Sequence, residues 1–300
     1  MSSKHYQIHK YFYHKAQILR SEFEAKFIQP TQTHSNRFVW DYWFVEDQYH
    51  LIRTPAVHYF SKNNYADFHS YLVQWGRENL GCHDISPPWL SYYVDGCFQN
   101  LHSDVPHGPW AFVYSLTSKK SDFKGGETLI LKPKTLNYWN SFQDQTNHEY
   151  SQFVDRVPSP FNQLTLFDPR YPHGVTEVKG TRDPLKARLV MHGWFVEPRP
   201  YVVGGLSTAQ VSKVLNPQFQ KLESILSNMG SLHGTMAIRL KIETKGKIEF
   251  FKIISNTVLS LENNIQDEKI FNKEMNFLFK QIIFPVAKKS SLITIPILLK

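Results

Sequence analysis

Between residues 89 and 196 the chain consists of short apolar segments separated by turn residues. Five of these segments have the length and composition of β-strands: 90–94, 110–116, 128–131, 163–167 and 187–195. Short strands that follow one another closely, with turns between them, pair in an antiparallel manner and form a sandwich or a jelly roll. This pattern constrains the fold more than any other feature, and it predicts a mainly β domain.

The residues that precede this series are rich in helix. Apolar side chains at helical spacing predict one helix over residues 12–27 and a second over residues 64–80, with strand interruptions between them. We therefore expect a domain of residues 1–204. In it, a helical lead-in over residues 1–84 flanks a jelly-roll core over residues 85–197.

A second, smaller domain is predicted for residues 207–300. Gly204-Gly205-Leu206-Ser207 has the composition of a linker. The elements expected after it are a helix over 208–228, strands over 236–243 and 248–255, a helix over 267–283 and a strand over 292–299. Ser207 should cap the first helix. Pro217 should break or restart that helix, with Asn216 as a second cap. This order predicts a small α+β domain.

The first candidates for functional residues lie in the segment His102-Ser103-Asp104. On an extended strand, the side chains of His102 and Asp104 project to the same side and Ser103 points away. His173, far along the chain, would complete a set of two imidazoles and one carboxylate. That set, with its other positions open, is the ligand set of non-haem Fe(II) oxygenases. A lone His-x-Asp is more often an ordinary surface pair, so the surrounding residues must decide.

Four separated motifs surround these candidate ligands. They are residues 93–102, with Tyr93, Gly96 and Phe98 ahead of His102; residues 125–131, which begin Gly125-Gly126-Glu127; residues 167–175, around His173; and residues 188–195, with Arg188 and Trp194. In this order and spacing the set resembles the Fe(II)/2-oxoglutarate dioxygenase superfamily, specifically its prolyl-4-hydroxylase-like branch. The resemblance is close over residues 85–197 and looser over residues 1–84.

The resemblance implies a double-stranded β-helix that binds Fe(II), 2-oxoglutarate and O2, and it admits ascorbate as a further cofactor. His102, Asp104 and His173 would be both the metal ligands and the catalytic residues. Arg188 would hold the far carboxylate of 2-oxoglutarate, because arginine offers a charged, planar, two-pronged donor. Arg182 is the competitor for that role, and we expect it on an exposed loop.

Three further residues on these strands bear on the cofactor site. Many relatives have Ser or Thr two residues after the arginine, whereas this chain has Val190; the phenol of Tyr93 would then donate to the same carboxylate. If Arg188 points inward, His192 does too, and it either contacts the site or is a satisfied core histidine. We expect Thr128 to be core packing rather than a contact.

The reaction implied by the resemblance is oxidation of an unactivated C–H bond, with release of succinate and CO2. Related halogenases lack the carboxylate ligand, so Asp104 favours hydroxylation. The substrate would be a protein or peptide side chain or an amino-acid-like metabolite. Two other classes stay open: a cupin-like metal-binding protein or isomerase that does not use 2-oxoglutarate, and a non-catalytic interaction adaptor.

The predicted C-terminal domain is similar to TonB C-terminal-like domains of the AgmX type, mostly in its hydrophobic pattern over residues 210–300. This likeness implies a fold and a role in protein interaction or dimerisation rather than a chemistry. A small α+β module with a free sheet edge is able to recruit an extended peptide.

Charge and composition limit the partners. The net charge is +8 at pH 7, and residues 207–300 hold thirteen Lys and Arg against seven Asp and Glu. These lysines are scattered and no nucleic-acid-binding motif accompanies them, so we expect no nucleic-acid partner. With only two cysteines, Cys82 and Cys97, no apolar N-terminal segment and no run long enough to span a membrane, we expect a cytoplasmic protein without disulfides or membrane contact.

Overall fold

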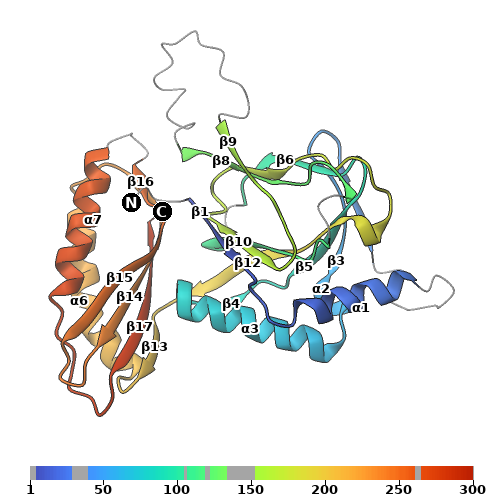
Figure 1. Ribbon diagram of the computed structural model, residues 1–300. Coiled ribbons are helices and arrows are strands. Elements are labelled where there is room, and N and C mark those ends of the chain that lie inside the picture. Colours follow the sequence, from blue (N-terminus) through green and yellow to red (C-terminus); the bar gives the residue numbers. More distant parts are fainter. Residues whose placement is uncertain are drawn as a thin grey trace, which may run out of the picture. The chain divides into compact units, whose positions relative to one another are not determined.

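The structure is a computed structural model that describes residues 5–28, 40–104, 107–118, 122–133, 153–260 and 265–299. These residues fall into two compact units (Figure 1). The N-terminal unit comprises His5–Leu72 and Ile85–Val196, and the C-terminal unit comprises Val73–Asp84 and Glu197–Lys300. The units thus differ from the expected ranges 1–204 and 207–300, because residues 73–84 and 197–204 belong with the C-terminal unit.

The N-terminal unit is built on one long, curled antiparallel sheet. Its described strands are β1 (Tyr6–Lys10), β2 (Asp41–Val45), β3 (Tyr49–Pro55), β5 (Trp89–Tyr93), β6 (Phe98–His102), β7 (Trp110–Ser115), β8 (Thr128–Leu131), β9 (Val154–Val157), β10 (Gln163–Phe167), β11 (His173–Val175) and β12 (Arg188–Pro198). The hydrogen-bonded order is β1-β10-β7-β12-β5-β3-β6-β11-β8-β9, with β2 beside β3.

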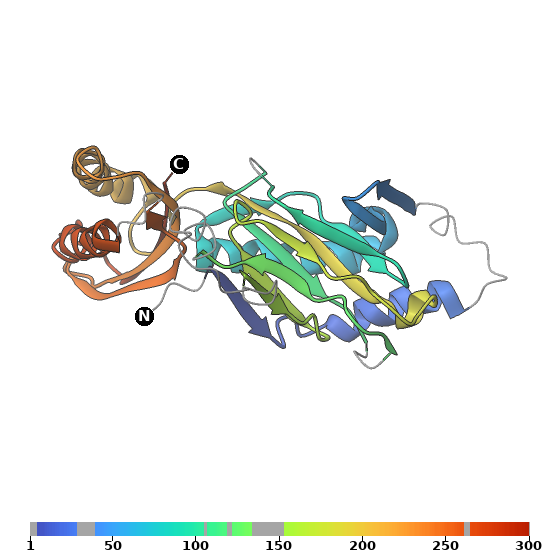
Figure 2. The same ribbon diagram turned by 90° about the horizontal axis from the view of Figure 1, so that it is seen from above.

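This sheet confirms the predicted jelly roll. Strands β1, β10, β7, β12, β5 and β3 make one side of the curled sheet, and strands β6, β11, β8 and β9 make the other (Figures 1 and 2). All five strands predicted between residues 89 and 196 are present, as β5, β7, β8, β10 and β12.

The predicted helices flank the sheet, but the lead-in also contributes to it. Helices α1 (Ala16–Ile28) and α3 (Lys62–Leu80) are the two that were predicted; the short helix α2 (Ala56–Tyr59) was not, and the short strand β4 (Cys82–Ile85) follows α3. The ring of Phe68 in α3 lies 4.8 Å from that of Tyr114 in β7, and the buried Arg20 of α1 donates to the carbonyl of Leu116 at 3.0 Å. The strand interruptions are integral to the fold, because β3 lies between β5 and β6.

The C-terminal unit has the predicted α+β character. It contains β13 (Tyr201–Gly204), α6 (Thr208–Leu226), β14 (Leu232–Ile242), β15 (Ile248–Asn256), β16 (Leu259–Ser260), α7 (Ile265–Lys280) and β17 (Ser291–Leu299). The sheet order is β13-β17-β14-β15, with β16 beside β14. Helices α6 and α7 lie side by side against one face of this sheet (Figure 1), where their apolar side chains share a core with β14 and β17.

Helix α6 confirms one expectation and contradicts another. The Ser207 hydroxyl accepts from the Gln210 backbone at 3.3 Å, and the Gln210 side chain accepts from the Ser207 backbone at 2.9 Å, which is a capping box. Pro217 does not break or restart the helix, so the prediction of a second cap at Asn216 was wrong. A proline inside a helix costs about 3 kcal/mol. Burial of apolar side chains on both sides of Pro217, among them Leu215 and Leu222, offsets that cost.

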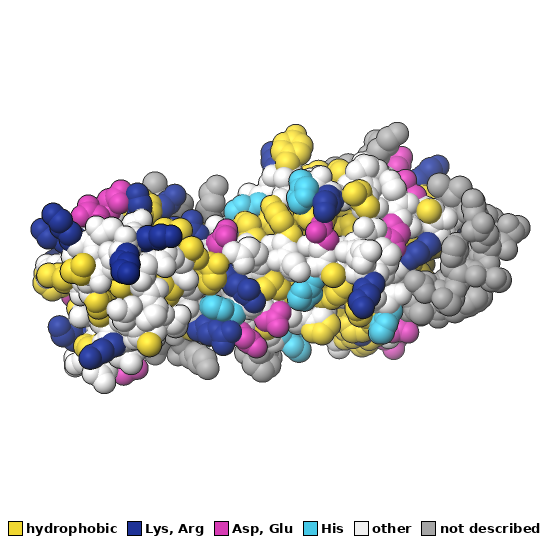
Figure 3. Space-filling model, turned by 90° about the horizontal axis from the view of Figure 1, so that it is seen from below, with side chains coloured by type: hydrophobic (Ala, Val, Ile, Leu, Met, Phe, Trp, Pro, Cys, Tyr) yellow, Lys and Arg dark blue, Asp and Glu magenta, His cyan; other side chains and the backbone are white. Residues whose placement is uncertain are grey.

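On the face shown in Figure 3, Lys and Arg side chains of the described residues lie singly or in small groups among acidic and apolar ones. In the described part of the chain, no helix combines the length and the apolar character needed to cross a membrane. Cys82 and Cys97 are both buried and free.

Candidate active site

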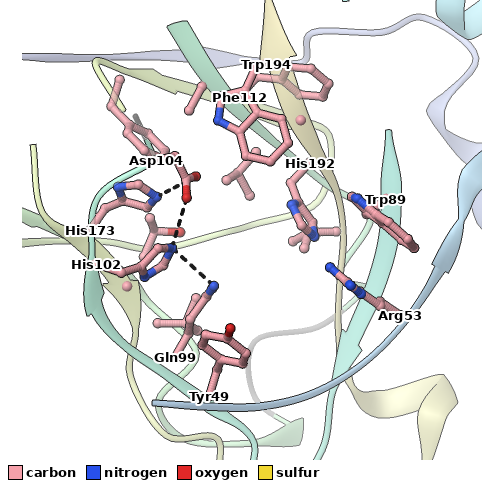
Figure 4. Close-up of a pocket in the computed structure, with 18 of the residues that line it drawn as sticks. Tyr49, Arg53, Trp89, Gln99, His102, Asp104, Phe112, His173, His192 and Trp194 are labelled. Atoms are coloured by element: carbon pink, nitrogen blue, oxygen red, sulfur yellow. Dashed lines mark hydrogen bonds and ion pairs between the residues drawn. The ribbon is translucent and has the colours of Figure 1, made fainter. Parts of the chain in front are cut away.

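A cavity of about 410 Å³ lies between the two sides of the curled sheet (Figure 4). Its volume falls within the range of small-molecule sites. Side chains from both sides of the jelly roll line it, chiefly from strands β3, β5, β7 and β12 on one side and β6, β8 and β11 on the other. All six site residues predicted from the sequence are among them: Tyr93, His102, Asp104, His173, Arg188 and His192.

The three predicted metal ligands converge at one end of this cavity. His102 ends β6 and His173 begins β11, and the two are direct partners in the antiparallel register. Asp104 follows β6; its Oδ2 lies 3.2 Å from His173 Nε2 and its Oδ1 lies 3.6 Å from His102 Nε2. One ligand atom from each residue lies within 4.8 Å of the other two. This is the spacing that a single bound ion requires.

The hydrogen bonds of the two histidines leave the correct nitrogen free for a metal. His102 Nδ1 lies 2.9 Å from the carbonyl of Asn100, and His173 Nδ1 lies 2.9 Å from the carbonyl of Tyr171. A carbonyl only accepts, so each Nδ1 carries a proton, and each Nε2, which faces Asp104, is the nitrogen that binds a metal once it has lost its own proton. Fixing the tautomer from behind in this way is how proteins orient histidine ligands.

The charge states also suit a divalent metal. Burial, followed by the nearby His173, lowers the pKa of His102. Burial alone would raise the pKa of Asp104, but the hydrogen bond from His173 and the charges of the neighbouring histidines outweigh it, and the pKa is lowered. A neutral imidazole and an ionised carboxylate are the forms that bind metal. The donor set therefore fits Fe(II).

Gln99 joins this cluster although the sequence did not single it out. Strict alternation on β6 would place Gln99 and His102 on opposite faces. The register shifts, however, between the pairs His102–His173 and Gln99–Val175, so that three residues of β6 span two of β11. Gln99 therefore lines the cavity with its Nε2 3.3 Å from His102 Nε2.

Arg188 lies at another part of the cavity wall, and it is buried with only 1% of its surface exposed. Its Nη2 donates to Thr128 Oγ1 at 3.2 Å, and its Cζ lies 4.6 Å from the centre of the Tyr93 ring. Its Nε and Nη1 are buried and have no hydrogen-bond partner among the described residues. A buried cation with free donors requires an anion, and an open cavity adjoins it.

Two glycines leave space for the Arg188 side chain, and a threonine hydroxyl binds its guanidinium. Gly125 and Gly126 adopt φ values of +78° and +72°, which confirms the turn predicted there. A Cβ on Gly126 would lie 3.0 Å from Arg188 Cδ. Thr128 is buried as the prediction of core packing requires, and its hydroxyl also accepts a hydrogen bond from Arg188. Thr128 thus places a hydroxyl beside the arginine, whereas the side chain of Val190 has no hydroxyl.

The remaining predicted residues take the following places. Tyr93 is buried, and its hydroxyl lies 3.5 Å from Gln99 Oε1. His192 points inward as alternation with Arg188 predicts, and its Nε2 lies 2.9 Å from Ser91 Oγ. Arg182, the competitor of Arg188, is exposed as expected.

His192 predicts how stability depends on pH. Burial, and then the positive charges of Arg188 and Arg53, lower its pKa to about 3. An unfolded histidine titrates near pH 6.5. Between about pH 6.5 and 3 the unfolded chain therefore binds a proton that the folded chain does not, and stability falls as the pH falls. We expect this group to remove about 2 kcal/mol of unfolding free energy between pH 6.5 and 5.

Urea titrations at several pH values measure this effect. In a His192→Gln variant the unfolding free energy should fall less steeply between pH 6.5 and 5, because the amide keeps a partner for Ser91 and does not titrate. His58→Gln, at an exposed position, is the control and should follow the wild type. Equal slopes for wild type and His192→Gln would contradict the assignment.

Residues 88–196, which include the three candidate ligands, Arg188 and His192, match the sequence model of the 2OG-Fe(II) oxygenase superfamily. The chain contains a 2OG-Fe(II) oxygenase domain. The protein is a 2-oxoglutarate-dependent dioxygenase, whose cofactors are Fe(II), 2-oxoglutarate and O2. The superfamily inferred from the motifs is thereby confirmed, whereas the likeness of the C-terminal part to TonB domains stays a prediction.

Several solved structures resemble the oxygenase. A prolyl-4-hydroxylase from Pseudomonas putida is 15% identical, with a TM-score of 0.42 over 65% of this chain and 94% of that one. A prolyl hydroxylase from Trichoplax adhaerens, in complex with a hypoxia inducible factor peptide, is 15% identical, with a TM-score of 0.43 over 64% and 83%. HygX from Streptomyces hygroscopicus, with nickel and 2-oxoglutarate bound, is 11% identical, with a TM-score of 0.42 over 64% and 82%. No curated protein matches the chain.

Proposed function

We propose that this oxygenase hydroxylates an unactivated C–H bond, with His102, Asp104 and His173 as the ligands of Fe(II) and Arg188 as the partner of 2-oxoglutarate. One observation carries the proposal. Three donor atoms within 4.8 Å of one another face the same cavity as a buried guanidinium with free donors. A keto acid that chelates the metal at one end and offers a carboxylate at the other fits both features.

Bound Fe(II) supplies the oxidising chemistry: with O2 it converts 2-oxoglutarate and R–H into succinate, CO2 and R–OH. The chain supplies position. His102, Asp104 and His173 would hold the ion, and three protein donors would leave its other positions open. Arg188, held by Thr128 and by the Tyr93 ring, fixes the far carboxylate of 2-oxoglutarate. Asp104 would occupy the position that related halogenases leave to halide, which favours hydroxylation.

The substrate is proposed to be a protein or peptide side chain or an amino-acid-like metabolite. The C-terminal unit is proposed as an interaction or dimerisation module, supported by β15, which ends the described sheet of that unit and offers an edge for strand addition. The participation of ascorbate and a cytoplasmic location stay predictions.

Anaerobic titration of the purified apo-protein tests the core of this proposal. Fe(II) alone should leave the visible spectrum unchanged, and subsequent 2-oxoglutarate should produce a metal-to-ligand charge-transfer band. If the band is absent with both present, Arg188 and the three ligands do not form a 2-oxoglutarate site. A metal-binding protein or isomerase that does not use the keto acid would show no such band.

A further inference from the structure

Arg53 enters the oxygenase cavity between two tryptophan side chains. It lies on β3, and its Cζ is 3.1 Å from the ring centre of Trp43 on β2 and 4.0 Å from that of Trp89 on β5. All three side chains line the cavity. Figure 4 shows Arg53 beside Trp89, across the cavity from His102. The indoles thus hold a charged group at a fixed place inside the site.

Among the described residues this guanidinium has no ion-pair partner within 4.0 Å, although Asp41 acts on it electrostatically from a greater distance. Its Nε is buried without a hydrogen-bond partner. Asp41 faces Arg53 in the strand register, but it is exposed and no ion pair within 4.0 Å joins the two described residues. Stacking against Trp43 and Trp89 stabilises the cation by about 0.5–2 kcal/mol for each ring, yet it leaves the in-plane N–H donors unused. Those donors are the part of arginine that binds a carboxylate.

Arg53 is separate from the arginine proposed for 2-oxoglutarate. In the register, Arg53 pairs with Ser91, and Ser91 pairs with Val190. Arg53 is therefore two strands away from β12, on the order of 10 Å between backbones. Arg188 lies on β12, two residues before Val190. The cavity consequently presents two guanidinium groups at different parts of its wall.

The charges of the loaded site cancel without Arg53. Fe(II) and Arg188 are balanced by Asp104 and the two carboxylates of 2-oxoglutarate, and imidazoles bind metals in their neutral form. Among the charged residues of the described lining, only Arg53 is left over. An uncompensated cation in a half-buried site favours a ligand that adds one negative charge.

We propose that Arg53 binds a carboxylate of the primary substrate, and hence that this enzyme oxidises an acidic molecule. The inference rests on the proposed function, because it assigns Arg188 to the co-substrate. Since the two tryptophans already immobilise the arginine side chain, binding loses little further side-chain entropy. The carboxylate would belong to a free amino-acid-like acid or to an acidic residue of a peptide.

Matched acid and amide ligands test this assignment and separate the two sources. One set contains free L-amino acids and their primary amides; the other contains N-acetylated, C-amidated peptides that carry either Glu or Gln. Each compound is added to the anaerobic enzyme with Fe(II) and 2-oxoglutarate, and binding is measured by calorimetry and by its perturbation of the charge-transfer band. We expect acids to bind at least about 10-fold more tightly than their amides. The set that responds identifies the source.

Variants show whether Arg53 is responsible. Arg53→Gln should lose the preference for acids, weakening their binding by about 10- to 100-fold, while Arg53→Lys should keep part of it because it retains the charge but not the planar fork. Arg156→Gln, at an exposed position on β9, is the control and should keep the full preference. Affinity for 2-oxoglutarate, followed through the band, shows that each variant is folded.

Several results would overturn the inference. They are equal binding of acids and amides, a preference that survives in Arg53→Gln, and an Arg53→Gln variant whose defect lies in 2-oxoglutarate binding. A panel in which no carboxylate binds more weakly to Arg53→Gln than to the wild type also counts against it. If the wild-type enzyme gives no band with Fe(II) and 2-oxoglutarate, the proposed function fails instead.

Discussion

Replacement of Asp104 by alanine should abolish the formation of succinate from 2-oxoglutarate. The carboxylate is the only anionic member of the three-residue donor cluster. Loss of a group that merely orients a ligand lowers metal affinity about 10- to 100-fold, so loss of a ligand itself should exceed 100-fold. His102→Ala and His173→Ala should behave in the same way. Succinate release and the iron content after dialysis measure both consequences.

Ser103→Ala is the matched control for these three variants. Ser103 lies between His102 and Asp104 in the chain, but its side chain is exposed and does not line the cavity. This variant should retain iron and turn over 2-oxoglutarate at the wild-type rate. An Asp104→Ala enzyme that works as well as Ser103→Ala would show that the three side chains do not form the metal site.

The sequence identifies the candidate ligands through signals that are local. His102 and Asp104 are two residues apart, and alternation on a strand suffices to place them on one side. His173 was assigned as a ligand from the motif around it, because strand alternation says nothing about a residue so far along the chain. The structure adds why the two histidines meet: β6 and β11 are neighbouring antiparallel strands, and His102 and His173 are direct partners. Such long-range strand pairing cannot be read from periodicity alone.

What the sequence missed depends on tertiary contacts. Arg53 belongs to a short strand in a segment that was expected to be mainly a helical lead-in, and only the pairing of β3 with β5 brings it into the cavity. Thr128 resembled any inward-facing strand residue until Arg188 was found against it. Pro217 was expected to break helix α6, but the helix continues through it because apolar side chains on both sides of Pro217 pack into a shared core.

Replacement of Arg188 by methionine should weaken binding of 2-oxoglutarate while stabilising the free protein. Removing one partner of a buried, hydrogen-bonded charge pair weakens binding by about 2 kcal/mol or more, which corresponds to an increase of about 30-fold or more in the Kd for 2-oxoglutarate. Without the co-substrate, however, the guanidinium has free buried donors, and methionine removes that penalty. We expect the unfolding free energy of the apo-protein to rise by about 1–3 kcal/mol.

Thermal unfolding with and without 2-oxoglutarate separates these opposite effects. With Fe(II) bound under anaerobic conditions, saturating 2-oxoglutarate should raise the Tm of the wild type and of an Arg182→Met control, in which an exposed arginine is replaced. In Arg188→Met that increase should largely disappear, although its apo Tm is the higher one. The combination is diagnostic, because general damage lowers both quantities and a purely structural arginine would leave the increase intact. An Arg188→Met enzyme with wild-type affinity for 2-oxoglutarate would mean that another cation binds the co-substrate. In the described lining of the cavity, the other arginine is Arg53.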